Sequence, residues 1–163
     1  MRIAEVTQAE LHFVVANMRE RNRAEMAALF GSQYEAVVLQ RFDAANAYCI
    51  ATEDGPVAVF SISEPRRGVT SVTSVGLFAT DAFPAVALRA THFLARRLFP
   101  ALRERSHRIE CVSLGAFEDT RKWLGAFGLR PEATLHAYGC NGEDFTVFAW
   151  TREGGAVSVG RGM

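Results

Sequence analysis

The stretch RIECVSLGAFEDTRKWLGAFGLRPEATLHAYGCNGEDFTVFAWTR, residues 108–152, holds the patterns that decide the fold. It opens with the apolar run 109–112, which is the length of a short buried strand. A segment with the i, i+3, i+4, i+7 spacing of one buried helix face follows, and its members are Thr120, Trp123, Leu124 and Phe127.

The sequence also predicts where this helix ends. Gly128 stands where a residue of left-handed conformation ends a helix, and Leu129 is then expected to fold back on Leu124. Two extended segments flank Asn141 and Gly142, a pair typical of tight turns. The stretch therefore predicts strand, helix, strand, hairpin turn and strand.

The first 45 residues are expected to be mostly helical. A strand at 2–6 precedes TQAE (7–10), a capping box in which Val6 and Leu11 form a hydrophobic staple. NRAE (22–25) and SQYE (32–35) repeat the pattern, with Gly31 as a break between them. Three helix starts follow, with Thr7, Asn22 and Ser32 as the N-caps.

The middle of the chain predicts three strands and one long helix. Strands at 48–52 and 57–62 flank a turn signal at Asp54-Gly55, and 71–78 is a third strand after a loop at 65–68, so that the first four strands form an antiparallel meander. The helix from Phe83 to Leu98 should end before Pro100. As a crossover, it makes the strands around Val75 and Ile109 parallel.

This order of elements resembles the GNAT domain, the fold of the Gcn5-related N-acetyltransferases. The ending Trp-Leu-x-x-Phe-Gly-Leu (123–129), followed by Gly-x-Asn-Gly-x-Asp-Phe (139–145), is similar to the second half of that domain. The resemblance implies an α/β fold with a mixed sheet of about seven strands, mostly antiparallel with a central splayed parallel pair, and about four to five flanking helices. We expect one domain at 1–152 and a flexible glycine-rich tail at 153–163.

The composition narrows the function. A length of 163 residues with 49% hydrophobic content suits a single domain, and a net charge of zero favours neither nucleic acid nor a membrane surface as partner. No apolar run is long enough for a membrane span, and the N-terminus is unlike a signal peptide, so a cytoplasmic protein is expected. Three cysteines far apart predict free buried thiols, namely Cys49, Cys111 and Cys140.

The resemblance implies a binding site for acetyl-CoA. In GNAT enzymes the pantetheine pairs with the edge of a splayed strand, here 76–78, and the pyrophosphate rests on the amides of the next loop, here 80–84. By position, the cofactor-binding residues are Leu77, Phe78, Thr80, Asp81, Ala82 and Phe83. The resemblance implies no metal.

The expected phosphate loop departs from the family in three ways. Its glycines are absent, Asp81 is the best N-cap and would repel phosphate, and Pro84 lacks an amide donor. Losing two charge-assisted hydrogen bonds at roughly 1.5–3 kcal/mol each would weaken cofactor binding by about a hundredfold to ten-thousandfold.

The family's catalytic residues are also missing. Leu124 stands at the position of the usual tyrosine, and Phe117 at that of a common asparagine; some acetyltransferases of protein N-termini also lack the tyrosine. Glu110 and Ser113 are the remaining polar groups near the expected cleft, where either could act as a general base through water. The alternative is that Glu110 is a solvent-facing strand residue and Ser113 a loop hydroxyl.

Other chemistries have less support. The four histidines have no partners at metal-ligand spacing, and no nucleophile elbow or phosphate-loop motif is present. Three arginine groups suggest a basic surface, namely Arg19, Arg21 and Arg23, then Arg96 and Arg97, then Arg103, Arg105 and Arg108. Glutamates interleave the first and last groups and the net charge is zero, which favours a solvated, ion-paired face.

Two functions remain open. The first is acetyl transfer to an amine, with strand amides near Leu77 polarising the thioester carbonyl. The second is a GNAT-fold pseudoenzyme that acts by binding a protein partner or a second copy. The sequence also resembles short GNAT-like proteins encoded among the virion genes of podophages. The shared features are VVANMRERNRAEMAALF (14–30), a reduced phosphate loop, and Arg-x-Trp-Leu-x-x-x-Gly (121–128) followed by Gly-x-Asp-Phe (142–145). This resemblance implies an acetyltransferase or an internal virion protein, present in the host cytoplasm or in the particle.

Overall fold

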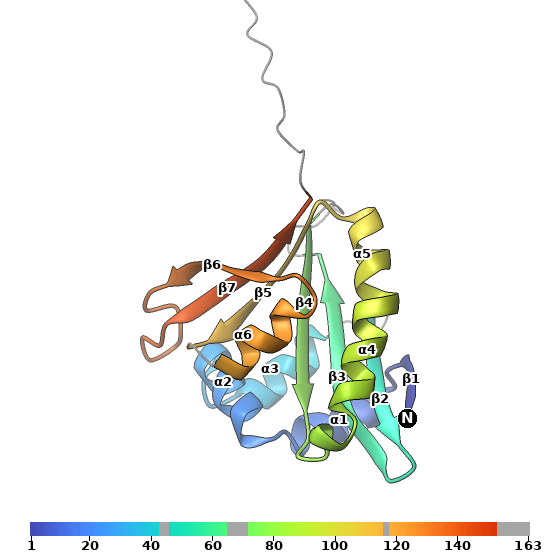
Figure 1. Ribbon diagram of the computed structural model, residues 1–163. Coiled ribbons are helices and arrows are strands. Elements are labelled where there is room, and N and C mark those ends of the chain that lie inside the picture. Colours follow the sequence, from blue (N-terminus) through green and yellow to red (C-terminus); the bar gives the residue numbers. More distant parts are fainter. Residues whose placement is uncertain (43–45, 65–71, 116–117, 153–163) are drawn as a thin grey trace, which may run out of the picture.

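A seven-stranded mixed sheet organises the chain (Figure 1). The computed structural model describes residues 1–42, 46–64, 72–115 and 118–152; the expected loop at 65–68 and tail at 153–163 lie outside them. The strand order is β1-β2-β3-β4-β5-β7-β6. The strands are β1 (Arg2–Glu5), β2 (Ala47–Thr52), β3 (Gly55–Ser63), β4 (Val72–Ala79), β5 (Arg108–Leu114), β6 (Arg130–Leu135) and β7 (Phe145–Thr151).

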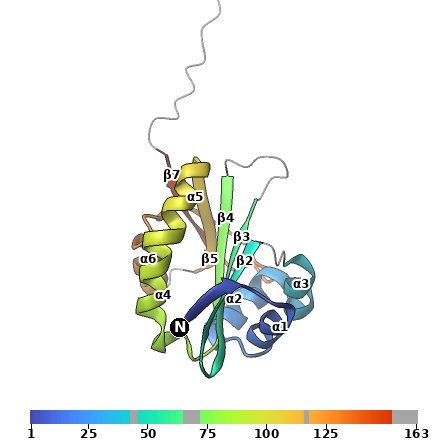
Figure 2. The same ribbon diagram turned by 90° about the vertical axis from the view of Figure 1, so that its right-hand side faces the viewer.

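Helices cover both faces of the sheet, as Figure 2 shows. One face is covered by α1 (Gln8–Ala16), α2 (Glu20–Phe30) and α3 (Tyr34–Arg41). The other is covered by a long composite helix and by α6 (Glu118–Gly125). The composite helix consists of η2 (Phe83–Ala85), α4 (Ala87–Phe93), the π-helical turn η3 (Leu94–Leu98) and α5 (Phe99–Arg105).

The sheet confirms the predicted pairing. Strands β1 to β4 form an antiparallel meander, β4 and β5 are parallel, and β5, β7 and β6 are antiparallel neighbours. The long helix between β4 and β5 is the crossover that this parallel pair requires. The β6–β7 hairpin is also present, with a longer connection than a two-residue turn: residues 136–144 link the strands, and the Gly142 amide closes a turn on the Gly139 carbonyl at 3.0 Å.

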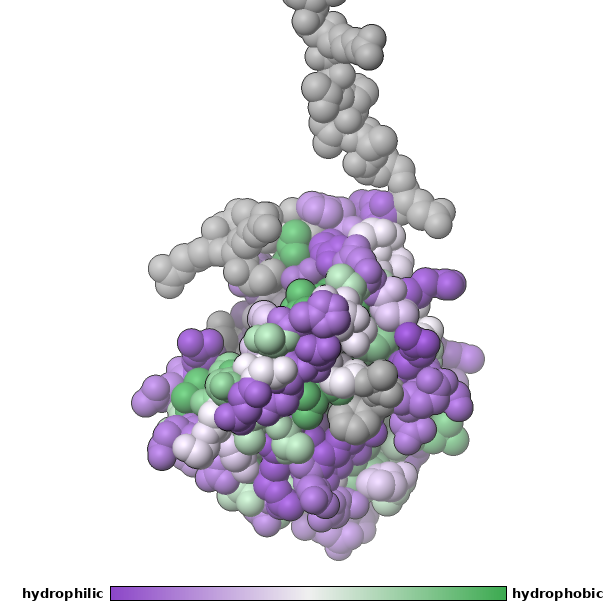
Figure 3. Space-filling view, turned by 90° about the vertical axis from the view of Figure 1, so that its left-hand side faces the viewer, coloured by the Kyte–Doolittle hydropathy of each residue, from purple (hydrophilic) through white to green (hydrophobic). Residues whose placement is uncertain are grey.

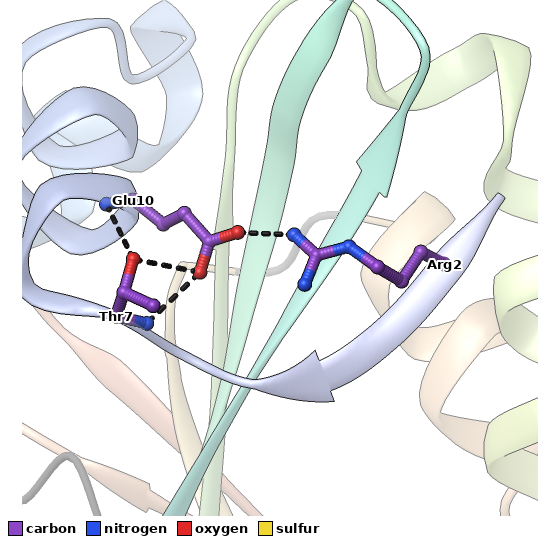
Figure 4. Close-up of polar contacts among 3 residues, drawn as sticks. All are labelled: Arg2, Thr7 and Glu10. Atoms are coloured by element: carbon purple, nitrogen blue, oxygen red, sulfur yellow. Dashed lines mark hydrogen bonds and ion pairs between the residues drawn. The ribbon is translucent and has the colours of Figure 1, made fainter.

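The capping box at the start of α1 is present as predicted (Figure 4). The Glu10 amide donates to Thr7 Oγ1 at 3.2 Å, and the Thr7 amide donates to Glu10 Oε2 at 2.9 Å. The Arg2 guanidinium also donates to the Glu10 carboxylate, which ties β1 to α1. Two amide donors at the helix start are thus satisfied locally.

The other two predicted N-caps are wrong. Helix α2 begins at Glu20 with Arg19 as its N-cap, and α3 begins at Tyr34 with Gln33 as its N-cap. Asn22 lies inside α2, where its side chain is buried and bonded to strand β4. The side chain that the local pattern assigned to an N-cap bonds instead to a strand that is distant in the sequence.

The long helix does not end before Pro100. It changes to a π-helical turn at Leu94–Leu98, where the Phe99 amide donates to the Leu94 carbonyl, and continues to Arg105 with Pro100 in the first turn of α5. A proline is tolerated in a first turn because its missing amide has no partner to lose there. After the π turn, α5 begins at Phe99, so the helix continues although Pro100 lies in that first turn.

Helix α6 ends as predicted. Gly128 has φ +78°, its amide donates to the Gly125 carbonyl at 2.9 Å, and the Leu129 amide donates to the Leu124 carbonyl at 3.2 Å. These two bonds are the Schellman motif, and Leu124 and Leu129 lie in one buried cluster. Phe99 stacks on Phe127 in the same cluster, with ring centroids 4.5 Å apart.

The prediction of three buried thiols is correct for two of them. Cys49 and Cys111 are buried, and burial raises the pKa of the Cys49 thiol to about 11 and that of Cys111 to about 12. Cys140 is exposed, because it lies in the β6–β7 connection and not in a strand. Its amide donates to the Ala28 carbonyl at 2.7 Å, which docks this connection on the end of α2.

Candidate functional site

The two parallel strands separate partway along their length. β4 and β5 are paired from Val72–Arg108 to Ser74–Glu110, and the pairing then stops although both strands continue. Residues 75–79 and 111–114 are therefore neighbours without a shared ladder. This is the predicted splay, and we call the space between these segments the notch.

Helix α2 occupies the β4 side of the notch. Asn22 Nδ2 donates to the Leu77 carbonyl at 3.4 Å, and the Ala79 amide donates to Asn22 Oδ1 at 3.1 Å. The Ala79 carbonyl accepts from the Arg19 amide at 2.8 Å. The free edge of β4 from Leu77 to Ala79 is thus bonded to side-chain and backbone groups around the start of α2.

The same helix occupies the β5 side one turn later. The Leu114 amide donates to Glu25 Oε1 at 2.7 Å, and the Ser113 hydroxyl bonds to the same carboxylate. Burial raises the pKa of Glu25 above its ordinary value, although both hydrogen bonds and the nearby Arg21 oppose that rise. Asn22 and Glu25, three residues apart on one helix face, therefore bridge the two separated strands. We call this pair the α2 wedge.

Two cavities adjoin the wedge. One, of about 90 Å³, lies between the separated strands and is lined by Glu25, Gly76, Cys111 and Ser113 with core aromatic residues. The other, of about 320 Å³, lies between α2 and the start of the composite helix and is lined by Arg19, Glu25, Phe83 and Trp123 among others. Glu25 lines both, so its carboxylate lies where they meet.

Trp123 links the two helices on the opposite side of the notch from α2. Its indole Nε1 donates to Thr91 Oγ1 at 2.8 Å, which joins α6 to α4. The ring also makes edge contacts with Phe83 and Phe127, with centroids 6.5 and 4.8 Å away. These contacts fill the space between α4 and α6 with side chains.

Most amide donors of the loop after β4 are bonded within the loop or to strand β3. Thr80 donates to the Val57 carbonyl at 2.8 Å, and Ala82 donates to Thr80 Oγ1 at 3.3 Å. Three further amides bond within the loop and the first helical turn, namely those of Phe83, Ala85 and Val86. Pro84 has no donor, and the antiparallel bridge between Met18 and Thr80 sets the Asp81 amide opposite the Asn17 carbonyl.

The predicted role of Asp81 as an N-cap is wrong. Ala82 precedes η2 and Val86 precedes α4, and neither makes a side-chain cap. Asp81 is exposed, and Thr80 supplies the hydroxyl that bonds the Ala82 amide. The Arg19 guanidinium lies over the Phe83 ring beside this loop, 5.2 Å from its centroid. The pKa of Arg19 is lowered, mainly by burial and secondly by repulsion from Arg21.

The two suggested catalytic residues are separated in space. Ser113 is buried and lines both cavities. Glu110 lies where β4 and β5 are still paired, and its carboxylate forms an ion pair with Arg108. Leu124, at the position of the family's tyrosine, is a buried core residue, and Phe117 lies outside the described residues. The structure thus brings Ser113 to the notch and leaves Glu110 outside it.

Two absences concern only the described part of the chain. No group of three or more histidine, cysteine, aspartate or glutamate side chains there could hold a metal ion. Within the same residues, every helix is too short or too polar to cross a bilayer.

Comparisons with known proteins place the fold. No family profile and no curated protein matches the sequence. The chain is similar to a putative acetyltransferase of Salmonella typhimurium, yncA, solved with its cofactor acetyl-CoA, at 14% identity and a TM-score of 0.70 over 95% of each chain. It is also similar to the ribosomal-protein-alanine N-acetyltransferase of Brucella melitensis, at 13% identity and a TM-score of 0.64 over 93% of this chain and all of that one.

A third similar structure carries the family name. It is a GNAT-family acetyltransferase of Bacillus anthracis, at 12% identity and a TM-score of 0.61 over 91% of this chain and 93% of that one. The chain therefore has the fold of the GNAT superfamily of acetyltransferases, as the sequence predicted.

In this chain, acetyl-CoA would meet hydrogen-bonding groups of the notch that already have partners. The β4 edge that pantetheine would use is bonded to Asn22 and Arg19, and most amides of the loop that would hold the pyrophosphate are already bonded. An anion site on a loop needs several amides aimed at one point. Both parts of the cofactor would have to displace hydrogen bonds that the protein already makes.

The raised pKa of Glu25 predicts a measurable pH dependence. A carboxyl whose pKa rises on folding stabilises the protein fully below its unfolded value, here about 4.5, and that contribution is lost as the pH rises through the folded pKa. Glu25→Gln should therefore gain stability relative to the unaltered protein as the pH rises from about 4.5 towards neutrality. Denaturant unfolding at a series of pH values measures this difference.

Glu53→Gln, an exposed residue in the β2–β3 turn, is the control for losing one carboxylate. A Glu25→Gln difference that stays flat or falls with pH would show that burial does not govern this group.

Proposed function

We propose that this GNAT-fold protein acts by binding another protein and does not transfer acetyl groups. The observation that carries the proposal is the α2 wedge, because Asn22 takes the strand edge that a coenzyme thioester would need. The bonded amides of the loop at 80–86 and the lack of a tyrosine at Leu124 support it independently. Because fold alone does not fix function, a protein that lacks the catalytic groups of its fold can act by binding.

The particular setting that we propose is a podophage particle. The support is the resemblance to short GNAT-like proteins encoded among podophage virion genes. On this proposal the partners are other virion proteins or a second copy of the chain, and the protein is made in the host cytoplasm before it enters the particle.

Acyl transfer is the second candidate, and Glu25 is the observation that favours it. Its carboxylate and the Ser113 hydroxyl lie at the junction of the two cavities, within a mostly apolar surrounding. A carboxylate with a raised pKa suits a general base. Under this candidate, α2 would have to move away from β4 before a donor could enter.

Isothermal titration with acetyl-CoA separates the two candidates. The expected result is no heat of binding up to millimolar cofactor, with the Salmonella yncA protein, whose structure holds acetyl-CoA, as the positive control. Micromolar binding together with transfer of the acetyl group to an amine would overturn the proposal. For the virion setting, mass spectrometry of purified particles should find the chain at a fixed copy number, and its absence from the particles would exclude that role.

A further inference from the structure

The outer side of the composite helix carries arginines that the fold does not use. Residues 87–105 contain five arginines and one glutamate in a chain of zero net charge. Arg103 points inward, where it donates to the Phe127 carbonyl and stacks over Trp150. Arg89, Arg96 and Arg97 are exposed and take part in none of the ion pairs formed among the described residues. The ion-paired face favoured by the sequence is therefore not found at Arg96 and Arg97.

A socket opens beside Arg97. It is a cavity of about 170 Å³ between the π turn and the sheet, lined by Ile3, Tyr48, Ile50, Phe93, Leu98 and Arg97 among others. Figures 1 and 2 both show the start of β1 next to α4. Ile3 of β1 and Phe93 of α4 both line the socket, so it lies between these two elements. Phe93 is 36% exposed at the socket, and Leu88, also on α4, is 83% exposed. We call Leu88, Arg89, Phe93, Arg96 and Arg97, with this socket, the arginine face.

We propose that the arginine face binds an acidic protein segment that inserts one large apolar side chain into the socket. Carboxylates of the segment pair with Arg96 and Arg97, and the apolar side chain packs against Phe93 and Leu98. The inference rests on the proposed function and gives its partner a chemical class. A cavity of about 150 Å³ can hold a benzene ring, so the socket is large enough for a phenylalanine or leucine side chain.

The chemistry of the face favours protein over nucleic acid. A phosphate backbone has no apolar side chain to fill the socket, and it would leave Leu88 and Phe93 exposed beside the contact. Nucleic-acid binding also draws on a strong overall positive charge, which a chain of zero net charge lacks. Interfaces commonly place an apolar anchor in a pocket with charged residues around it.

The opposite side of the molecule has a different character. Figure 3 shows that the side carrying β6 and β7 has small hydrophobic areas separated by hydrophilic residues. Arg108 on this sheet is ion-paired with Glu110 and Glu132, so its charge is already matched. Arg108 therefore offers an acidic partner less unmatched charge than Arg96 and Arg97 do.

A random peptide library, selected on the full-length protein, tests the proposal. Selected peptides should be rich in aspartate and glutamate and should share one aromatic or leucine residue. Their affinity, measured by fluorescence anisotropy, should fall about tenfold or more in the double variant Arg96→Glu/Arg97→Glu, and similarly when the peptide's apolar residue becomes alanine. Arg130→Glu, an exposed arginine on β6, should leave binding unchanged.

Other outcomes would overturn the proposal. These are selected peptides that are basic or uncharged, binding that survives the double variant, binding that Arg130→Glu weakens equally, or a short DNA duplex that binds more tightly than any selected peptide. Ile3→Trp adds a further check, because filling the socket without changing charge should also weaken binding. A negative peptide result would refute this inference and would not bear on the acetyl-CoA titration. Acetyl transfer by the protein would refute the proposed function, and the peptide result could still be interpreted by itself.

Discussion

Replacing Gly128 by alanine is expected to lower the free energy of unfolding by about 3 kcal/mol. The φ of +78° costs an L-residue about 1–2 kcal/mol. A Cβ at this position would also lie 2.7 Å from Arg103 Nη2, which donates to the Phe127 carbonyl. Moving that guanidinium sacrifices a charged hydrogen bond and its position over Trp150, for a further loss of about 1–3 kcal/mol.

Gly142→Ala is the matched control for this effect. Gly142 has a similar φ of +86°, but nothing lies within 4 Å of an added Cβ. Urea unfolding of both variants separates the backbone cost, which they share, from the displacement of Arg103, which only Gly128→Ala causes. Equal losses in the two variants would contradict the role given to Arg103, and Gly128→Ala made in an Arg103→Ala background should cost no more than Gly142→Ala.

This helix end shows what the sequence predicts well. The Schellman motif involves residues within five positions of each other, so Gly128 and its neighbours are enough to specify it. The parallel pairing of β4 and β5 follows for a related reason, because the long helix between them restricts how the chain can return to the sheet. The sequence therefore predicts features that depend on neighbouring residues, such as this helix end, and features fixed by the way parallel strands must be connected.

The failures share a different cause. Asn22 has the spacing of an N-cap, but its side chain bonds to Leu77, 55 residues away. Pro100 normally ends a helix, yet the π turn before it provides a new helix start that apolar spacing does not reveal. In both cases the rest of the structure overrides a local rule. It gives Asn22 a hydrogen-bond partner that is distant in the sequence, and it places a π turn before Pro100.

The candidate site was predictable in its location and not in its content. The splay follows from the fold, and the expectation of a weak phosphate loop follows from missing glycines. The α2 wedge does not, because Asn22 and Glu25 carry the pattern of a capping box and no signal marks them as strand partners. A polar pair at i, i+3 with one buried and one half-buried member, beside strands that must separate, is the signal that sequence reasoning could use in such folds.

Replacing Asn22 by alanine should lower the free energy of unfolding by about 2–4 kcal/mol. The variant leaves the Ala79 amide without its acceptor and the Leu77 carbonyl without its donor, in a region where Asn22 is only 4% exposed. A buried polar group left without a partner costs about 1–3 kcal/mol. Urea unfolding measures the loss.

Asn17→Ala is the control, because Asn17 Nδ2 also donates to a backbone carbonyl, that of Phe13 at 2.8 Å, but on the exposed end of α1. Its loss should stay below about 1 kcal/mol, since water can replace the bond. If Asn22→Ala costs no more than Asn17→Ala, the wedge does not hold the β4 edge, and the main obstacle to a cofactor in the notch would be gone. A large loss for Asn22→Ala alone would mean that the separated strands of this chain depend on α2 for the hydrogen bonds along the notch.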